Sequence, residues 1–453
     1  MLIENKGQTE ERVLLIGVLL PGDEEWRVRD TLDELAQLAE SAGAVVMERI
    51  LIRQAKLKAG HFIGTGKAEE IAEEAEEKKA TMVVFDDDLS PVQGRNLESV
   101  LKVRVLDRTQ LILDIFAMRA QTREGCLQVE LAQHQYLLPR LRNMWTHLER
   151  QKGGIGLRGP GETQLEMDRR RIQDLIRTLK RDLELVRARR AEQRRGRRRH
   201  GWALVSLVGY TNAGKSTLLN QLSGASIYTQ DQLFATLDPT TRQVELPQLE
   251  PILMTDTVGF IQKLPTHLVD SFKATLEEVV EADLLLHVVD ASHPQVDMQL
   301  DAVHHVLEEI GGLNKPMIYV FNKIDDQSGA RAVRRLLRRF QNTAAVSAKT
   351  GEGMETLFDG IAECLKDRTE ELQLSVPLNE GRLLALLRER GVILESNYDG
   401  GIAELRVAGL TSVSGSVFPI CRLSLAFSFR DAVGVQLSLL DPTRRPVRVE
   451  RVQ

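Results

Sequence analysis

The sequence predicts a multidomain α/β protein, and three observations support this fold class. The chain has 453 residues, which allows about three domains at roughly 150 residues each. Apolar segments typical of strands alternate with amphipathic segments typical of helices. Aromatic residues make up only 4% of the chain, which fits helix-rich α/β layers better than an aromatic-rich sandwich. We therefore expect parallel sheets covered by helices.

The composition excludes several classes of protein. With 42% hydrophobic and 28% charged residues, the chain is neither disordered nor fibrous. The apolar run Val13–Leu20 follows the polar stretch Glu4–Arg12, so it is too short for a membrane span and wrongly flanked for a signal peptide. Cys126, Cys364 and Cys421 lie far apart without a CxxC pair, which argues against a disulfide framework or a zinc site. We expect a cytoplasmic protein.

An N-terminal α/β domain is expected over residues 1–121. Its predicted strands are Arg12–Leu20, Ala44–Ile52, Thr81–Asp86 and Lys102–Leu106, and its predicted helices are Trp26–Ala42 and Lys67–Lys79. This order indicates a small parallel sheet. Gly60 and the stretch Gly64–Lys67 resemble a phosphate loop before a helix but lack its full spacing. Because short glycine turns into helices are common, a second nucleotide site there is the less favoured interpretation.

A basic helical hairpin with a glycine-rich tip is expected over residues 122–200. Apolar residues recur at three- and four-residue steps or their multiples, at Leu127, Leu131, Leu138, Leu141, Trp145 and Leu148, and again at Ile172, Ile176, Leu179, Leu183 and Val186. Residues 153–161, with five glycines, interrupt this pattern. Two long antiparallel helices are therefore predicted. The tip is either a plain connector or a loop that inserts into a partner.

Charge is segregated along the chain. Residues 1–100 carry 21 Asp and Glu and 12 Lys and Arg, a net charge of −9, whereas residues 165–200 carry 14 Lys and Arg and 6 Asp and Glu, a net charge of +8. Such a basic block is typical of proteins that bind a polyanion, because each neutralised phosphate releases counterions. A solvated helix face is the alternative. The candidate RNA contacts are Arg158, Arg194, Arg195, Arg197, Arg198 and Arg199.

A complete phosphate-binding loop follows the apolar strand Ala203–Val208. The GxxxxGK[ST] pattern comprises Gly209, Tyr210, Thr211, Asn212, Ala213, Gly214, Lys215 and Ser216, and the helical stretch Thr217–Leu222 comes next. In this order of strand, loop and helix, backbone N–H groups point at phosphate oxygens. Lys215 would contact the β- and γ-phosphates, and the Ser216 hydroxyl would ligate Mg²⁺.

Two further segments carry residues suited to sensing the γ-phosphate. The strand Pro251–Met254 leads to Asp256, Thr257, Val258 and Gly259. Asp256 would hold the magnesium ion from behind its direct ligands, and the Gly259 N–H would meet the γ-phosphate. The earlier segment comprises Phe234, Ala235, Thr236, Leu237 and Asp238. Thr236 is our candidate for a second magnesium hydroxyl, with Thr240 and Thr241 as competitors. Lys215, Asn212, Thr236 and Gly259 are the candidate catalytic residues.

The strand Met317–Phe321 and the residues after it favour guanine as the base. Asn322, Lys323, Ile324 and Asp325 follow this strand, and Ser347, Ala348 and Lys349 follow a later one. The Asp325 carboxylate can accept hydrogen bonds from the N1–H and the amine of guanine, whereas adenine lacks this donor pair. Asn322 would brace the loop, the Lys323 stem would cover the base, and the Ala348 N–H would meet the guanine carbonyl. GTP, rather than ATP, is the predicted ligand.

The ordered motifs resemble the HflX branch of the P-loop GTPases. The resemblance rests on the glycine-rich segment 153–161 followed by Glu162, Thr163 and Gln164, and on GYTNAGKST, FATLD, DTVGF and NKID. It implies a ribosome-associated GTPase that binds the large ribosomal subunit, helps to dissociate stalled or stressed ribosomes and places the hairpin loop against ribosomal RNA. It also implies ATP binding by the N-terminal domain, and hence weak ATPase activity. The resemblance is weakest after Leu410, and we assign residues 411–453 no chemistry.

The residue after Gly259 is Phe260, which cannot position water as a glutamine would. The isolated protein should therefore hydrolyse GTP slowly. The resemblance suggests that Asn212 ligates K⁺, which would neutralise charge between the phosphates; the alternative is that Asn212 satisfies backbone groups of its own loop.

The complete expectation is a monomer that hydrolyses GTP by in-line attack of water, with Mg²⁺ and a candidate K⁺ as cofactors. Its GTPase domain spans residues 201–367, and a small α+β domain spans 368–453. The alternatives are a GTPase of ribosome assembly or tRNA modification and a binding module that holds GTP with negligible hydrolysis.

Overall fold

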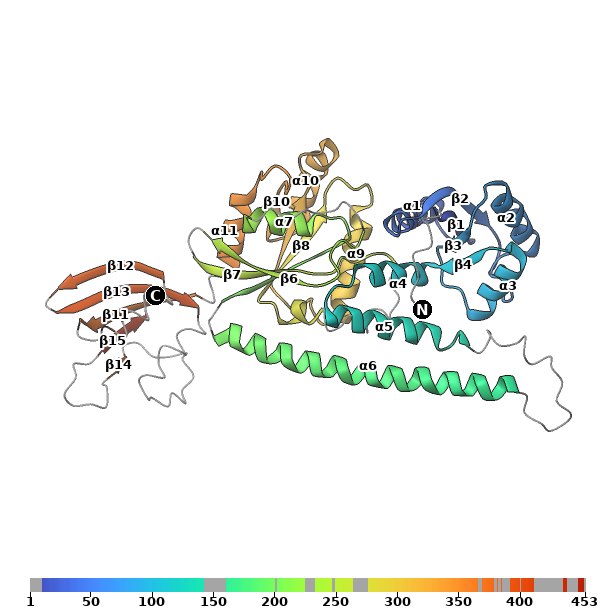
Figure 1. The fold of residues 1–453 in the computed structure, drawn as a ribbon. Coiled ribbons are helices and arrows are strands. Elements are labelled where there is room, and N and C mark those ends of the chain that lie inside the picture. The colour runs from blue at the N-terminus through green and yellow to red at the C-terminus, as the bar shows by residue number, and fades with distance from the viewer. Residues whose placement is uncertain are drawn as a thin grey trace. The chain divides into compact units, whose positions relative to one another are not determined.

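The chain folds into two compact units. Unit 1 comprises Met1–Val186, Gln230–Asp238 and Val258–Thr275, and unit 2 comprises Arg187–Thr229, Pro239–Thr257 and Leu276–Gln453. The computed structural model (Figure 1) describes residues 10–141, 160–199, 202–224, 233–246, 249–263, 276–365, 369–378, 381, 384, 392–399, 401–410, 435–437 and 447–451. Within these ranges, no helix combines the length and the apolar character that a bilayer crossing requires.

Unit 1 contains the predicted parallel sheet. Its strands are β1 (Arg12–Leu19), β2 (Val45–Arg53), β3 (Met82–Phe85) and β4 (Arg104–Asp107), in the spatial order β2-β1-β3-β4. Its helices are α1 (Glu25–Ser41), α2 (Thr65–Glu77), α3 (Pro91–Leu101) and α4 (Arg108–Arg119). The sequence analysis missed α3, although Ser90 and Gln93 form a capping box and Pro91 occupies its first turn. It also missed α4, which the Asp107 side chain caps.

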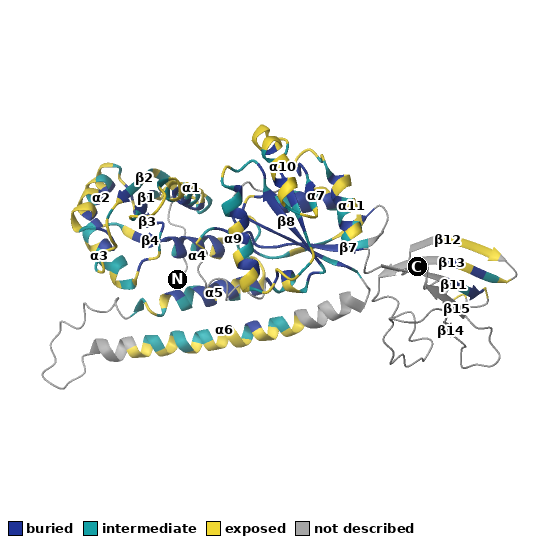
Figure 2. Cartoon of the chain, turned by 180° about the vertical axis from the view of Figure 1, so that it is seen from behind, coloured by how far each residue is buried: buried dark blue, intermediate teal, exposed yellow. Residues whose placement is uncertain are grey.

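The helical arm consists of α5 (Arg123–Leu137) and α6 (Pro160–Arg199). Within unit 1 the two helices lie side by side (Figures 1 and 2), and Leu131 of α5 is buried with Leu179 and Leu183 of α6. The predicted pairing of apolar seams is therefore confirmed. Because α6 begins at Pro160, the last two residues of the predicted glycine-rich interruption are helical. Trp145, Leu148, Arg158 and the rest of that interruption lie outside the described residues, as do the side chains of residues 190–199.

Unit 2 contains a six-stranded sheet. Its strands are β5 (Leu204–Gly209), β6 (Thr240–Leu246), β7 (Leu249–Asp256), β8 (Leu284–Asp290), β9 (Met317–Asn322) and β10 (Thr343–Ala345), in the order β10-β9-β8-β5-β7-β6. All neighbouring strands are parallel except β6, which is antiparallel to β7. The parallel strands therefore end at one shared edge, where ligands bind in open α/β sheets.

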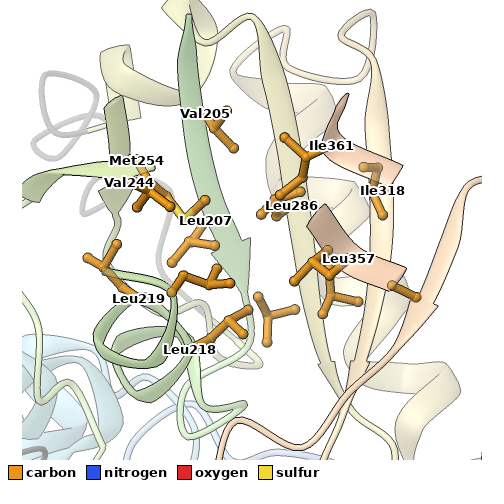
Figure 3. Close-up of a cluster of buried hydrophobic side chains, with 14 of the residues drawn as sticks. Val205, Leu207, Leu218, Leu219, Val244, Met254, Leu286, Ile318, Leu357 and Ile361 are labelled. Atoms are coloured by element: carbon orange, nitrogen blue, oxygen red, sulfur yellow. The ribbon is translucent and has the colours of Figure 1, made fainter. Parts of the chain in front are cut away.

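Helices cover this sheet and bury its apolar side chains. They are α7 (Lys215–Ser223), α9 (Val296–Glu309), α10 (Gln327–Arg339) and α11 (Met354–Leu365). One cluster, drawn in Figure 3, joins Leu207 of β5 and Leu286 of β8 to Leu218 of α7 and Leu357 of α11. The ends of β5 and β8 and the start of α7 are thereby fixed in position by a packed core.

Unit 2 also contains a five-stranded antiparallel sheet. Its strands are β11 (Thr369–Pro377), β12 (Val392–Asp399), β13 (Ile402–Leu410), β14 (Val435–Leu437) and β15 (Val447–Arg451), in the order β12-β13-β11-β15-β14. Strand β14 lies within the predicted β-like run Val435–Leu440, whereas the other run, Val417–Phe427, lies outside the described residues. The tail thus contributes strands, and no motif places chemistry on them.

Candidate active site

The phosphate-binding loop connects β5 to α7 in the predicted way. Asn212 has φ of +59° and Gly214 has φ of +93°, both in the left-handed region. A Cβ added to Gly214 would overlap the Asn322 side-chain amide, so only glycine fits this position. The curvature of the loop therefore requires glycine at position 214, which is the second glycine of the GxxxxGK[ST] pattern.

Lys215 is buried at the start of α7. Its ammonium donates to the carbonyl oxygens of Gly209 at 3.1 Å and Tyr210 at 2.9 Å. Burial lowers the pKa of Lys215 to about 8, and the negative charge of Asp256 offsets only part of this effect. A phosphate beside the ammonium would favour its charged form for the same electrostatic reason.

Ser216 and Asp256 form the candidate magnesium site. The Ser216 hydroxyl donates to Asp256 Oδ2 at 2.6 Å, and Asp256 is buried at the end of β7. The Ser216 hydroxyl is an oxygen ligand of the kind that Mg²⁺ prefers, and the Asp256 carboxylate beside it can accept hydrogen bonds from other ligands of the ion, so these residues fit Mg²⁺. The neighbouring Thr257 hydroxyl donates to the Leu207 carbonyl at 2.6 Å, which ties the end of β7 to β5.

Asn322 joins the phosphate-binding loop to the base-reading loops. Its side-chain amide donates to the Ala213 carbonyl at 2.8 Å, and its side-chain oxygen accepts from the Ala348 N–H at 2.9 Å. The predicted bracing role is therefore visible in the geometry. The Ala348 N–H, which we expected to meet the guanine carbonyl, donates to Asn322 in this structure.

The side chains around the base position are held by polar contacts. Asp325 is exposed, and its Oδ1 accepts from the Ser347 hydroxyl at 2.7 Å. Lys323 has φ of +64°, and its ammonium pairs with Asp290 at 2.7 Å. Ser347 therefore orients the carboxylate that we expect to read guanine, and Asp290 restrains the lysine that we expect to cover it.

The predicted site residues divide between the two units. Unit 2 holds the phosphate-binding loop, Asp256, Thr257 and the base-reading loops. The segment Phe234–Asp238 and the residues Val258 and Gly259 belong to unit 1. Unit 2 thus contains the predicted phosphate and base residues together with Asp256 and Thr257, whereas the segment Phe234–Asp238 and the residues Val258 and Gly259 belong to unit 1.

Asp238 contacts the start of α5. Its carboxylate accepts from the N–H groups of Gln121 and Thr122, both at 2.9 Å, and from the Thr122 hydroxyl. That hydroxyl in turn accepts from the Gly125 N–H at 3.0 Å and caps α5. A Cβ added to Gly125 would overlap Asp238 Oδ1, so the close approach requires glycine. The predicted nucleotide-binding residue Asp238 is thereby tied to the helical arm.

The remaining members of this segment have distinct surroundings. Phe234 is buried, and its ring packs edge-to-face against the Phe116 ring with 4.7 Å between the ring centroids. Thr236 is half-buried. Of its competitors as a magnesium ligand, Thr240 and Thr241 both lie in β6, and the Thr241 hydroxyl lies 2.9 Å from the Thr255 hydroxyl. Thr236 therefore stays the predicted magnesium ligand, with Thr240 and Thr241 as its competitors.

A buried ionic network holds Gln262 and Lys263, which follow the predicted γ-phosphate contact Gly259. Arg108, with 1% of its surface exposed, pairs with Asp86 at 2.7 Å and Glu34 at 2.5 Å and donates to the Gln262 carbonyl at 3.2 Å. Lys263 pairs with both Asp86 and Asp87 at 2.7 Å. Burial lowers the pKa of Lys263, but these two carboxylates outweigh burial and raise it overall.

The sequence analysis missed this network. Its signal was the acidic run Asp86–Asp88 directly after a buried strand, which we had interpreted only as the end of that strand. The partners of this run lie up to 177 residues away along the chain, so no local pattern could pair them.

Asn212 and Phe260 bear on how water is positioned. Asn212 is exposed, and its side chain makes no hydrogen bond with another described residue. The alternative in which it satisfies backbone groups of its own loop is therefore not seen in the described part of the chain. Phe260 is 2% exposed and packs in the interior of unit 1.

Comparison with known proteins decides the family. A GTPase HflX from Lacrimispora saccharolytica is 48% identical over 397 residues, which cover 88% of this chain and 93% of the relative. The chain belongs to the HflX GTPase family. The family's Escherichia coli member is 46% identical over 374 residues, 82% of this chain and 87% of the relative.

Family models and a solved structure add detail along the chain. The models "GTP-binding GTPase N-terminal", "GTP-binding GTPase Middle Region" and "50S ribosome-binding GTPase" match residues 29–117, 119–197 and 204–323. A GTP-binding protein from the archaeon Sulfolobus solfataricus, solved with GDP, is 22% identical with a TM-score of 0.43, covering 79% of this chain and 99% of that one.

We predict that Asp325→Asn changes the base preference of the HflX site. Loss of charged hydrogen bonds to guanine should weaken GTP binding by roughly 10- to 100-fold. Binding of xanthosine triphosphate should strengthen, because a carboxamide can donate to the extra carbonyl of xanthine. Equilibrium titration with labelled nucleotides measures both. The matched control is Asp326→Asn, which alters the neighbouring carboxylate that caps α10. Unchanged guanine preference in Asp325→Asn would show that this loop does not read the base.

A second prediction concerns the contact between Asp238 and α5. Gly125→Ala should lower the free energy of unfolding of the protein by about 1–3 kcal/mol, because the new methyl group overlaps the carboxylate. Urea denaturation followed by circular dichroism measures the change. Gly94→Ala in α3 is the control, since an added Cβ there meets no atom within 4 Å. That variant should be neutral or more stable by up to about 1 kcal/mol. Equal effects of the two substitutions would contradict the contact.

Proposed function

We propose that this chain is a ribosome-associated GTPase that binds the large ribosomal subunit, hydrolyses GTP to GDP and phosphate, and dissociates stalled or stressed ribosomes. Membership of the HflX family supports the proposal, as does the "50S ribosome-binding GTPase" model over residues 204–323. The observation that carries it is the double hydrogen bond of Asn322, which joins the phosphate-binding loop to the guanine-reading loops. The protein acts as a monomer in the cytoplasm, with domains at 1–121, 122–200, 201–367 and 368–453.

The reaction is attack of water on the γ-phosphate, in line with the bond to the leaving β-phosphate. Lys215 binds the β- and γ-phosphates, and the Gly259 N–H meets the γ-phosphate. Ser216 and Thr236 are the residues that would ligate Mg²⁺, and the Asp256 carboxylate would support the ion from behind its direct ligands. The ion neutralises phosphate charge when it is bound. Positioning and charge stabilisation supply most of the reduction in the barrier.

The isolated protein hydrolyses GTP slowly, and binding to the ribosome raises the rate. Phe260 is buried and cannot orient water, so intrinsic hydrolysis is slow. The exposed amide of Asn212 would ligate K⁺, and the ion would supply the charge neutralisation that an arginine finger gives in other GTPases. Arg158 and the arginines at 194, 195, 197, 198 and 199 contact ribosomal RNA through its phosphates, because the surrounding block is strongly basic.

Weak ATP hydrolysis by the N-terminal domain is a separate proposal. Gly64 precedes α2, and Lys67 lies in the first turn of that helix, where its ammonium pairs with Glu70. Both side chains are exposed, so the pair contributes little stability and a phosphate could displace the carboxylate. Phosphate release from ATP in the Lys215→Ala variant, with Lys67→Ala added, would separate this activity from the GTP site.

The proposed function predicts ribosome-stimulated GTP hydrolysis. Purified large subunits should raise the rate of phosphate release from GTP by at least about tenfold, and the protein should cosediment with them more strongly in a non-hydrolysable GTP analogue than in GDP. Neutralising the five arginines at 194, 195, 197, 198 and 199 should weaken cosedimentation while leaving GTP affinity unchanged. Absence of any stimulation by mature subunits would contradict the proposal, and binding only to precursor particles or tRNA would favour the assembly or modification alternatives.

A further prediction concerns the monovalent cation. Replacing Na⁺ by K⁺ at matched ionic strength should raise the hydrolysis rate of the protein alone, because K⁺ ligated by Asn212 neutralises charge between the phosphates. Asn212→Ala should abolish this response and retain GTP affinity within about threefold. The rate with K⁺ is compared with the rates in Na⁺ and in choline. Equal wild-type rates in the three salts would overturn the role of K⁺ without affecting the ribosomal proposal.

A further inference from the structure

Helix α10 presents a basic face that the sequence motifs do not explain. Its 13 residues include Arg331, Arg334, Arg335, Arg338 and Arg339 but no Asp, Glu or Lys. All five arginines are exposed, and Figure 2 shows exposed residues along the whole helix. The helix follows the guanine-reading loop directly, since its cap residue Asp326 adjoins Asp325.

The opposite face of α10 packs against the sheet. Leu336 is fully buried with Phe321 of β9 and Val289 of β8, and Ala332 and Val333 pack against the same cluster. Because this apolar side is fixed against the core, the arginines are held on the outer side of the helix. The basic face is therefore a defined surface of the folded domain.

Two of the five arginines form ion pairs within the domain. Arg335 and Arg339 pair with Asp297 of α9 at 3.2 Å and 2.5 Å, and these bonds tie α10 to its neighbour. The helix dipole favours Arg338 and Arg339, which lie in the last turn. Neither effect accounts for Arg331 or Arg334.

Arg331, Arg334 and Arg338 form what we call the α10 stripe. None of the three makes an ion pair with another described residue. Their spacing of three and four residues puts them on one side of the helix, over a length of about 10 Å. Like charges at these spacings repel one another and weaken the helix. The stripe therefore costs stability in the free protein, and an anionic partner would relieve this cost.

The stripe fits a phosphate backbone better than an acidic protein. Guanidinium groups bind phosphate oxygens in pairs and are weakly hydrated, which suits repeated phosphate contacts. A protein interface would also need buried apolar or aromatic anchors. Among the described residues of α10, the exposed face offers only Leu337 as a large apolar side chain, and it is 37% exposed.

We propose that the α10 stripe is a second RNA-binding surface, which contacts the phosphate backbone of RNA independently of the helical arm. The inference rests on the proposed function only in that ribosomal RNA is the natural source of such a backbone. It assigns RNA contact to the GTPase domain itself, on the helix that continues from the guanine-reading loop.

The test compares full-length variants, of which the stripe variant and its control remove the same number of positive charges. R331Q/R334Q/R338Q should weaken binding to purified large ribosomal subunits by roughly 10- to 100-fold at 0.1 M salt, and should reduce the slope of log K against log salt concentration by about 2–3. The control K56Q/K58Q/K79Q removes three exposed lysines from the N-terminal sheet domain and should change neither value. R331K/R334K/R338K keeps the charge and should retain most of the salt slope. Circular dichroism and GTP affinity verify that all variants fold.

Two additional probes distinguish the possible outcomes. A labelled RNA hairpin and poly-glutamate are titrated against the same proteins. If wild type binds the hairpin through the stripe but does not bind subunits, the proposed ribosomal function fails and the RNA surface stands. If R331Q/R334Q/R338Q loses binding to poly-glutamate but still binds the RNA hairpin and the large subunits as wild type does, the surface is a site for an acidic protein and the inference is overturned. An unchanged salt slope with both subunits and hairpin overturns it as well.

Discussion

The two hydrogen bonds of the Asn322 side chain are the contact on which the nucleotide site depends. One joins β9 to the phosphate-binding loop and the other joins it to the loop after β10. Asn322 is 2% exposed, so these bonds form in a low-dielectric interior where an unpaired amide would be costly. The phosphate-binding and base-reading halves of the site therefore have one fixed relative position. The residues predicted to read guanine and to bind phosphate therefore lie at the same packed edge of the sheet.

The predicted γ-phosphate-sensing segments are held by charged side chains rather than by a neutral amide. Asp238 is held by Gln121 and Thr122, which directly precede α5, and Lys263 is held by carboxylates that follow β3. These contacts are charge-assisted hydrogen bonds and ion pairs. If a segment moved and a carboxylate lost its partner, the unpaired charge would destabilise the protein until another partner replaced it. The predicted phosphate- and base-binding residues thus belong to one compact unit, whereas Phe234–Asp238 and the residues from Val258 to Lys263 belong to the other.

The local geometry of the candidate nucleotide site was predictable, because each of its requirements involves residues close together in the sequence. The loop needs a glycine at position 214, where φ is positive, and it needs a hydroxyl at the start of α7, where Ser216 stands. Asp325 could be placed because it comes shortly after a predicted strand. The parallel sheet and the paired apolar seams of the arm followed from periodicity in the same way. The Arg108 network was not predictable, because its partners come from four distant segments and only the tertiary fold selects them. The outward face of α10 required the structure too, since its arginines alone do not show which side is buried.

The position of Phe234 has a consequence for any attempt to study the GTPase domain by itself. Its ring is buried against Phe116 of α4, so a shortened protein that begins near residue 201 would expose an aromatic side chain and leave Asp238 without its partners on α5. Such a fragment would expose an apolar, association-prone surface. Its hydrolysis rate would then describe a segment that has lost its native neighbours, so enzymology of the GTPase domain needs the N-terminal part of the chain to be present.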